Sequence, residues 1–321
     1  MLASKIVAPA KVEITEVEKP ELEKGTVLVK MQVGTICGSD LHLFERPRPP
    51  EDYPLAPGFS GHECVGIVED SDSGDFQKGD RVLICPYPPI GFAQYVILQP
   101  QYLVKLPPNG DLEKLVIGQQ LGTVVYCCKK LPNVIDMDVA ILGQGAGGLL
   151  FTAMLCNMGA RKIIGIDIVA DRLQVAKKMG ATHVVDASKE DPVAAVKEIT
   201  NGNMADLAVE AVGEPETINQ VVDLIRDRGY LVLFGIAPVG DIGFDYMRFF
   251  RKHPIAISSS RTENEKGYRS FKLAMDMIVQ GRIDVTPMIS HHIPLSQIDQ
   301  AYDLALHKKD GAVKVLLDMQ G

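Results

Sequence analysis

The stretch DVAILGQGAGGLLFTAMLCNMG, residues 138–159, decides the fold of this chain of 321 residues. An apolar run leads into three glycines in the order G-x-G-x-x-G, namely Gly143, Gly145 and Gly148, and a second apolar run ends at Gly159. The first glycine of such an order permits a tight turn, the second lets the backbone come close to a pyrophosphate, and the third lets a helix pack closely on the strand. The stretch therefore predicts a strand, a turn and a helix whose N-terminus offers N–H groups to phosphates.

Apolar runs and helical patterns alternate from about residue 118 onward. Examples are the apolar run RKIIGID at 161–167, the helical pattern ADRLQVAKKMG at 170–180 and the apolar run GYLVLFG at 229–235. Alternation at this spacing is typical of a parallel, doubly wound sheet. This part of the chain is therefore predicted to be an α/β domain that binds a dinucleotide.

An acidic residue, Asp167, ends the strand that follows the glycine-rich turn, nineteen residues after Gly148. A carboxylate at this place accepts hydrogen bonds from ribose hydroxyls and repels a 2′-phosphate, so the sequence favours NAD over NADP. Arg172 is a further candidate for cofactor binding. The alternative is that Asp167 only caps the helix that begins near Ala170.

Short β-rich runs separated by turns fill the first third of the chain. GTVLVKMQVGTI at 25–36 alternates apolar and polar residues, and ECVGIVED at 63–70 and DRVLICPY at 80–87 are rich in β-branched residues. We predict an all-β module over residues 1–117. The tail, 287–321, has a strand–helix–strand pattern and is expected to return to this module.

Composition excludes several classes of protein. The net charge of −8 comes without a basic run, which argues against nucleic acid or an anionic membrane as partner. Glycines or prolines interrupt the long uncharged stretches, so no membrane-spanning helix is expected. Six cysteines without a C-x-x-C pair, and an N-terminus unlike a signal peptide, favour a reducing cytoplasm.

Two short motifs, ICGSDLH at 36–42 and GHECVG at 61–66, bring potential metal ligands into the β module. Cys37 and His62 are each, taken alone, ordinary buried residues, but thiolate and imidazole together are typical zinc ligands. Glu63 adds a carboxylate beside His62. The two motifs therefore indicate a zinc site.

With GTICGSDLH, GHECVG, KGDRV, GFAQYV, GQGAGG and the closing HIPLSQIDQAYDLALHKKDGAVKVLL, the chain resembles the medium-chain dehydrogenase/reductase family along its whole length. The similar branch is that of the zinc-dependent alcohol and polyol dehydrogenases, such as sorbitol and threonine dehydrogenases. The resemblance implies a GroES-like β-barrel catalytic domain over 1–117 and 287–321 and a Rossmann NAD-binding domain over 118–286. It also implies a catalytic zinc in the cleft between them and a homodimer or homotetramer.

The resemblance carries roles over to single residues. Cys37 and His62 correspond to two zinc ligands, and Asp40 to the carboxylate that orients His62. Ser39 stands where the family places the hydroxyl that touches the substrate oxygen, and His42 where some members pass the proton to solvent. The alternatives are helix caps for Ser39 and Asp40 and a solvated side chain for His42.

The chain departs from the family pattern in two places. The four-cysteine lobe that holds a structural zinc is absent, so one catalytic zinc and no structural zinc are expected. Gln119 stands where polyol-type members carry a glutamate as third ligand. We therefore expect Gln119 or Glu63 to complete the shell, and the alternative is a member that has lost its metal.

Arg261 follows a strand of the second domain, and the resemblance implies that it contacts the substrate. The alternative is a surface arginine that caps the next helix. The expected reaction is hydride transfer between NAD(H) and a secondary alcohol or ketone, such as a polyol or another polar alcohol, with zinc as Lewis acid. Two alternatives stay open: a zinc-free medium-chain reductase of a ketone or activated double bond, and a catalytically silent NAD-binding protein.

Overall fold

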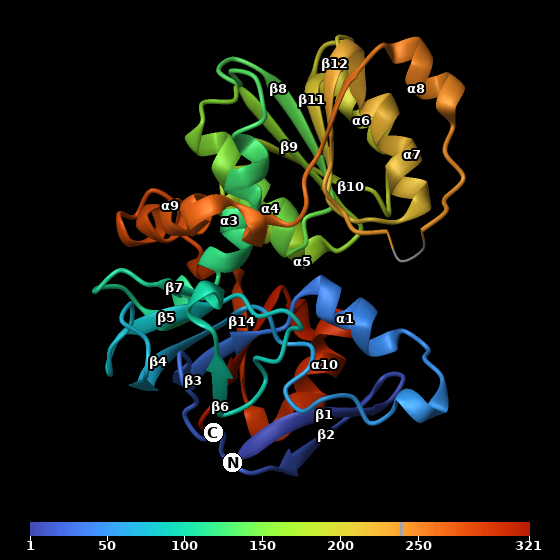
Figure 1. Ribbon diagram of the computed structural model, residues 1–321. Coiled ribbons are helices and arrows are strands. Elements are labelled where there is room, and N and C mark those ends of the chain that lie inside the picture. The colour runs from blue at the N-terminus through green and yellow to red at the C-terminus, as the bar shows by residue number, and fades with distance from the viewer. Residues whose placement is uncertain (238–239) are drawn as a thin grey trace. The chain divides into compact units, whose positions relative to one another are not determined.

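The computed structural model describes residues 1–237 and 240–321 (Figure 1). It divides into two compact units, each with its own sheet and its own hydrophobic core. The first unit consists of Met1–Gln119, Lys266–Gln280 and Ile289–Gly321, and the second of Gln120–Glu265 and Gly281–Met288.

A seven-stranded sheet and a two-stranded hairpin form the β framework of the first unit. The sheet has the strand order β14-β15-β3-β4-β5-β7, with β6 paired to β3, and the hairpin joins β1 to β2. Only the pair β14–β15 is parallel. The strands are β1 (Leu2–Ala8), β2 (Lys11–Glu16), β3 (Val27–Thr35), β4 (Cys64–Ser71), β5 (Arg81–Ile84), β6 (Tyr95–Leu98), β7 (Leu103–Lys105), β14 (Ile289–Pro294) and β15 (Lys314–Asp318).

Four α-helices belong to the first unit, and α10 packs on the hairpin and on β14 and β15. Tyr302 of α10 is buried, stacks on Phe44 of α1 and meets Phe92 edge to face. The tail of the chain thus returns to the β module, as the sequence predicts. The helices are α1 (Gly38–Glu45), α2 (Leu112–Leu115), α9 (Arg269–Val279) and α10 (Ile298–His307).

Six parallel strands in the order β10-β9-β8-β11-β12-β13 form the sheet of the second unit. Numbered along the chain this is the order 3-2-1-4-5-6 of a doubly wound fold, whose order reverses between β8 and β11. The predicted fold class, a GroES-like β domain with a Rossmann sheet, is confirmed. The strands are β8 (Asp138–Leu142), β9 (Lys162–Asp167), β10 (His183–Asp186), β11 (Ala205–Glu210), β12 (Ile225–Leu233) and β13 (Ile255–Ser258).

The helices of the second unit follow from local sequence. All residues of α4 from Gly148 to Leu155 are buried, as expected of a helix that is apolar all round. Asp191 caps α6 by accepting hydrogen bonds from two backbone N–H groups, with Pro192 at the first position. The helices are α3 (Gly118–Cys128), which begins at the boundary, α4 (Ala146–Asn157), α5 (Ala170–Lys178), α6 (Pro192–Ile199), α7 (Pro215–Leu224) and α8 (Tyr246–Lys252).

The predicted domain division placed the segment that carries α9 in the Rossmann domain. In the structure it belongs to the first unit. Its apolar face supplies the reason, because Met275 lies against Gly118, where a Cβ atom would come within 2.7 Å, and Val279 lies against Gly110. The boundaries at 117 and 286 stay a proposal.

Candidate functional site

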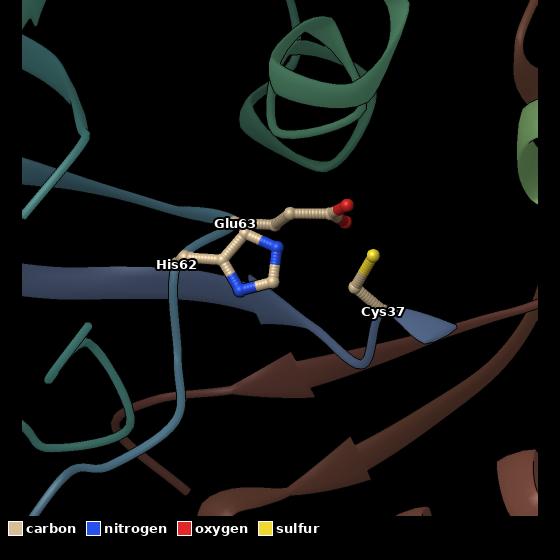
Figure 2. Close-up of side chains that lie close together, drawn as sticks. All are labelled: Cys37, His62 and Glu63. Atoms are coloured by element: carbon tan, nitrogen blue, oxygen red, sulfur yellow. The ribbon is translucent and has the colours of Figure 1, made fainter. Parts of the chain in front are cut away.

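The antiparallel register of the first sheet brings together the two motifs that were predicted to bind a metal. Gly34 pairs with Cys64, so the residues after β3 meet the residues before β4. Cys37 precedes α1, and His62 and Glu63 precede β4. One ligand atom from each of the three lies within 4.8 Å of the others, and Figure 2 shows the side chains turned toward one another. These groups suit a zinc ion, because one thiolate, one imidazole and one carboxylate are all zinc ligands.

Asp40 fixes two of these candidate ligands with one carboxylate. Its Oδ1 atom lies 3.0 Å from Nδ1 of His62, which leaves Nε2 for a metal. Its Oδ2 atom accepts a hydrogen bond of 2.8 Å from the backbone N–H of Cys37. The helix cap that the sequence left as an alternative for Asp40 is thus present together with the contact to His62.

A buried chain of hydroxyls continues behind Asp40. Ser60 donates to Oδ1 of Asp40 at 2.9 Å, and the Oγ atom of Ser60 lies 3.4 Å from the hydroxyl of Tyr302. Burial raises the pKa of Tyr302, so this hydroxyl keeps its proton. The sequence motifs did not reveal Ser60 or Tyr302, because neither stands in a ligand spacing.

The basicity of His62 follows from its surroundings. Burial by itself lowers the pKa of His62, but the carboxylate of Asp40 and the thiol of Cys37 raise it, and the net pKa lies well above the ordinary value. A carboxylate on one ring nitrogen makes the other a stronger donor to a metal. Asp40 therefore holds the imidazole of His62, a candidate metal ligand, in one orientation.

Ser39 stands next to both of these ligands. Its Oγ atom lies 3.3 Å from Nε2 of His62 and 3.4 Å from Sγ of Cys37. His42 follows three residues later on α1, on the same side of the helix as Ser39. The structure therefore places a hydroxyl at the candidate metal site, with an imidazole one helical turn away.

Glu63 is fully buried and already has partners. Its Oε2 atom accepts hydrogen bonds from Thr35 Oγ1 and from the ammonium group of Lys314, which is also fully buried. Burial raises the pKa of Glu63, but Lys314 and His62 lower it by a larger amount. The net pKa therefore lies below the ordinary value, and the carboxyl group is ionised. Burial likewise lowers the pKa of Lys314, and Glu63 raises it above the ordinary value. A lysine inside the apolar run AVKVLL was the sequence signal for this pair.

Two further predicted site residues, Gln119 and Arg261, lie in α3 and before a short helix. Gln119 is the second residue of α3 and is half-buried, and its backbone N–H donates to the carbonyl of Val116. Arg261 is exposed, has a φ of 55° and precedes the short helix Thr262–Asn264. The roles of Gln119 as a ligand and of Arg261 as a substrate contact stay predictions.

The glycine-rich turn follows the last residue of β8, at the edge of the second sheet that is formed by the carboxyl ends of its parallel strands. Gly143 has a φ of 92°, and a Cβ atom on Gly148 would lie 1.8 Å from the carbonyl oxygen of Gly143. Gly145 differs: its φ is −67°, and the nearest described atom to a Cβ there would be Nη1 of Arg172 at 3.7 Å. Neither strain nor packing within the unit requires glycine at 145, so the space fits a ligand that approaches the backbone.

Asp167 lies beside this turn because β9 runs next to β8. Its Oδ2 atom accepts from the backbone N–H of Gln144 at 2.6 Å, and its Oδ1 atom from that of Val169 at 2.8 Å. Burial lowers the pKa of Arg172 by more than the carboxylate of Asp167 raises it, so the net pKa lies below the ordinary value. The carboxylate of Asp167, the guanidinium of Arg172 and the glycine-rich turn therefore lie together. Their role in binding a dinucleotide stays a prediction.

The side chain of Gln144 was missed by the sequence reasoning. It is fully buried, donates to the carbonyls of Ile141 and Gly143 at 3.2 Å, and accepts from Thr152 Oγ1 at 2.9 Å. Gly165 of β9 leaves room for it. The amide of Gln144 therefore connects the turn to the end of β8 and to α4. Its position inside the glycine motif was the feature of the sequence that could have pointed to it.

A second missed residue is Glu210, the last residue of β11. Its Oε1 atom accepts from the N–H groups of Val212 and Gly213 and from Thr217 Oγ1, all within 2.9 Å. Its Oε2 atom is buried without a hydrogen-bond partner among the described residues. Glu210 borders a pocket of about 320 Å³, lined also by residues 233–236 and 258–260.

Comparisons with known proteins match both parts of the chain to families of dehydrogenases. Residues 147–280 match the family model for a zinc-binding dehydrogenase, and residues 23–108 match that for an alcohol dehydrogenase GroES-like domain. The chain is 27% identical to L-threonine 3-dehydrogenase of Chromobacterium violaceum over 98% of both chains, and 26% identical to sorbitol dehydrogenase of Bacillus subtilis over 95% of this chain and 94% of that one.

A solved structure extends the likeness. Alcohol dehydrogenase TADH from Thermus sp. ATN1 superimposes with a TM-score of 0.83 at 27% identity, covering 99% of both chains. Among the helices of the described residues, none is both long and apolar enough to cross a membrane.

Proposed function

The chain belongs to the zinc-binding medium-chain dehydrogenase family, and from this premise we propose that it transfers a hydride between NAD(H) and a polar secondary alcohol or its ketone, with a single zinc ion at Cys37 and His62. One observation carries the proposal: the ligand atoms of Cys37, His62 and Glu63 converge within 4.8 Å while Asp40 occupies the other nitrogen of His62. A convergence of this kind, with an oriented imidazole, is what a zinc site requires.

A zinc ion bound there supplies Lewis-acid chemistry toward an alcohol or carbonyl oxygen. The residues of the chain then orient the substrate and move its proton. The Ser39 hydroxyl, 3.3 Å from Nε2 of His62, is near enough to exchange a hydrogen bond with a group at the site. His42, one turn along α1, is the proposed acceptor that passes the proton to solvent. Asp40 keeps the imidazole of His62 in one orientation throughout.

The cofactor is proposed to be NAD rather than NADP. The open face of Gly145 and the N-terminus of α4 suit a pyrophosphate, and the carboxylate of Asp167 suits a ribose without a 2′-phosphate. Three exposed apolar side chains come shortly after the carboxyl ends of β9, β11 and β12, namely Ile168 (62% exposed), Val212 (41%) and Ile236 (63%). They are proposed to pack against the planar rings of the cofactor.

A polar secondary alcohol, such as a polyol, is the proposed substrate class. The relatives whose names mention threonine and sorbitol support this class, and Arg261 is the proposed polar contact. We further propose a homodimer or homotetramer in a reducing cytoplasm, which accords with six cysteines that form no disulfide.

The test combines metal content with a cofactor-linked assay on the full chain. Mass spectrometry of protein purified without chelator should find about one zinc per chain, and NAD-dependent oxidation should appear in a panel of secondary alcohols and polyols. Cys37→Ser should lose both, while Cys156→Ser, a change at an exposed cysteine, should lose neither.

The outcomes separate the alternatives. Reduction of a ketone or an activated double bond by a protein without metal, unchanged by Cys37→Ser, would make the chain a zinc-free reductase. NADH binding with no turnover across the panel would make it a silent NAD-binding protein.

A further inference from the structure

The carboxylate of Glu63 lies between the ammonium of Lys314 and the candidate metal ligands Cys37 and His62. Its Oε2 atom bonds to Thr35 and to the ammonium of Lys314, and its Oε1 atom has no hydrogen-bond partner among the described residues. The same carboxylate belongs to the cluster with Cys37 and His62. One carboxylate is therefore shared by a fixed ammonium and a site built for a divalent metal.

The position of Lys314 is fixed by the sheet. Leu316 of β15 pairs with Thr35 of β3, and the backbone N–H of Ile36 donates to the carbonyl of Val315. Lys314 begins β15 and is fully buried. A buried ammonium needs a nearby anion, because charges removed from water are costly unless they are paired. Lys314 thus has a strong hold on the carboxylate of Glu63.

The charges of the cluster indicate what this hold does. In the form that binds a metal, His62 is neutral and Cys37 is a thiolate. With the carboxylates of Asp40 and Glu63 and the ammonium of Lys314, the cluster then carries two net negative charges. A divalent metal makes this set neutral. Without Lys314 the same metal would meet three negative charges, and Glu63 would have no competing cation. The neutral amide of Gln119 would not alter this balance.

We propose that Lys314 is a positioning residue that restrains Glu63 as a neighbour of the metal rather than a full ligand, and so limits how tightly zinc is held. The inference rests on the proposed zinc site. A weaker hold leaves more positive charge on the metal, which is the property that Lewis-acid chemistry uses.

The experiment measures the zinc dissociation constant of the full chain by competition with a chromophoric chelator. Lys314→Met should bind zinc about 10- to 100-fold more tightly than the wild type, the range in which residues that contact metal ligands act. Lys314→Arg keeps the charge and should restore the wild-type value. Lys78→Met, a change at an exposed lysine of the same unit, is the matched control.

Dependence on Glu63 distinguishes this role from general stabilisation. In a Glu63→Gln background, Lys314→Met should no longer tighten zinc binding. The visible absorption spectrum of the cobalt-substituted chain should change with Lys314→Met alone, because the ligand set changes. If Lys314→Met prevents folding, Thr35→Val removes the other donor to Glu63 and should tighten zinc in the same direction by a smaller factor.

Two results overturn the inference in different ways. A wild-type chain that binds zinc, with Lys314→Met or Thr35→Val binding it equally or more weakly, would overturn the role of Lys314 and leave the proposed function standing. A wild-type chain that binds no more zinc than Cys37→Ser would overturn both.

Discussion

The Oδ1 atom of Asp40 lies 3.0 Å from Nδ1 of His62, while its Oδ2 atom accepts a hydrogen bond of 2.8 Å from the N–H of Cys37. One buried carboxylate thereby connects Cys37 with His62, which stand 25 positions apart in the sequence. It sets the orientation of the imidazole and the start of helix α1 at once.

This relationship predicts the result of Asp40→Asn. The amide cannot accept both hydrogen bonds, so zinc affinity should fall about 10- to 100-fold, as expected when the partner of a metal-binding histidine is changed. Chelator competition on the purified chain measures the effect. Asp75→Asn, at an exposed aspartate of the same unit, should leave the affinity unchanged. Equal affinity in both variants would remove Asp40 from the site.

Ser39→Ala should separate proton movement from metal binding. Loss of the hydroxyl beside His62 should lower kcat for alcohol oxidation by about 100-fold or more, the usual size of a general acid–base contribution. Zinc content should stay the same, and Ser39→Thr should recover part of the rate. An unchanged kcat would assign the proton to another group.

Alanine at Gly145 and alanine at Gly148 of the glycine-rich turn should have different effects, the first on cofactor binding and the second on stability. Gly145→Ala adds a methyl group into open space at an ordinary φ, so the chain should keep its melting temperature but bind NADH at least about tenfold more weakly, or about 1.4 kcal/mol. Gly148→Ala places a Cβ atom against the carbonyl of Gly143 and should destabilise the unit by about 3 kcal/mol or more.

Calorimetry for NADH and thermal unfolding for stability check this pair together. Weak NADH binding by Gly145→Ala with a lowered melting temperature would show that residue 145 packs inside the protein instead of facing a ligand.

Asp167→Ser should shift cofactor choice. Removal of the carboxylate ends the repulsion of a 2′-phosphate and leaves the guanidinium of Arg172 nearby, so the preference for NAD over NADP should fall about 10- to 100-fold. The ratio of kcat/KM values for the two cofactors is the measurement. Asp171→Asn, at an exposed residue of the first turn of α5, serves as control and should keep the preference.

Thiol reactivity should depend on pH and on metal. Burial raises the pKa of Cys127 to about 11 and raises that of Cys128 as well, so both remain protonated and unreactive near pH 8, where only the thiolate attacks a reagent. Cys156 is exposed and should react at once. Cys37 should react only after zinc is removed by a chelator.

Labelling followed by peptide mass spectrometry identifies the modified residues. Equal labelling of Cys37 with and without chelator would contradict its role as a ligand, and the reactivity of Cys127 should rise only as the pH approaches its pKa.

Local requirements of the backbone determined what the sequence revealed by itself. The order of Gly143, Gly145 and Gly148 after an apolar run specifies strand, turn and helix, because each glycine answers a constraint within a few residues. Cys37, His62 and Glu63 were found for a similar reason: metal-ligand side chains stand out in short motifs. The doubly wound fold, the glycine-rich turn and the candidate ligands therefore followed from the sequence.

Contacts between distant segments were decided only by the tertiary structure. Lys314 lies 251 residues from Glu63 and meets it because β15 returns to pair with β3. Gln144 supports the turn only because Gly165 of the neighbouring strand leaves space for it. Strand register and buried volume are properties of the packed chain. The sequence alone could therefore name the candidate ligands, but it could not show that a buried lysine is bonded to the carboxylate of one of them.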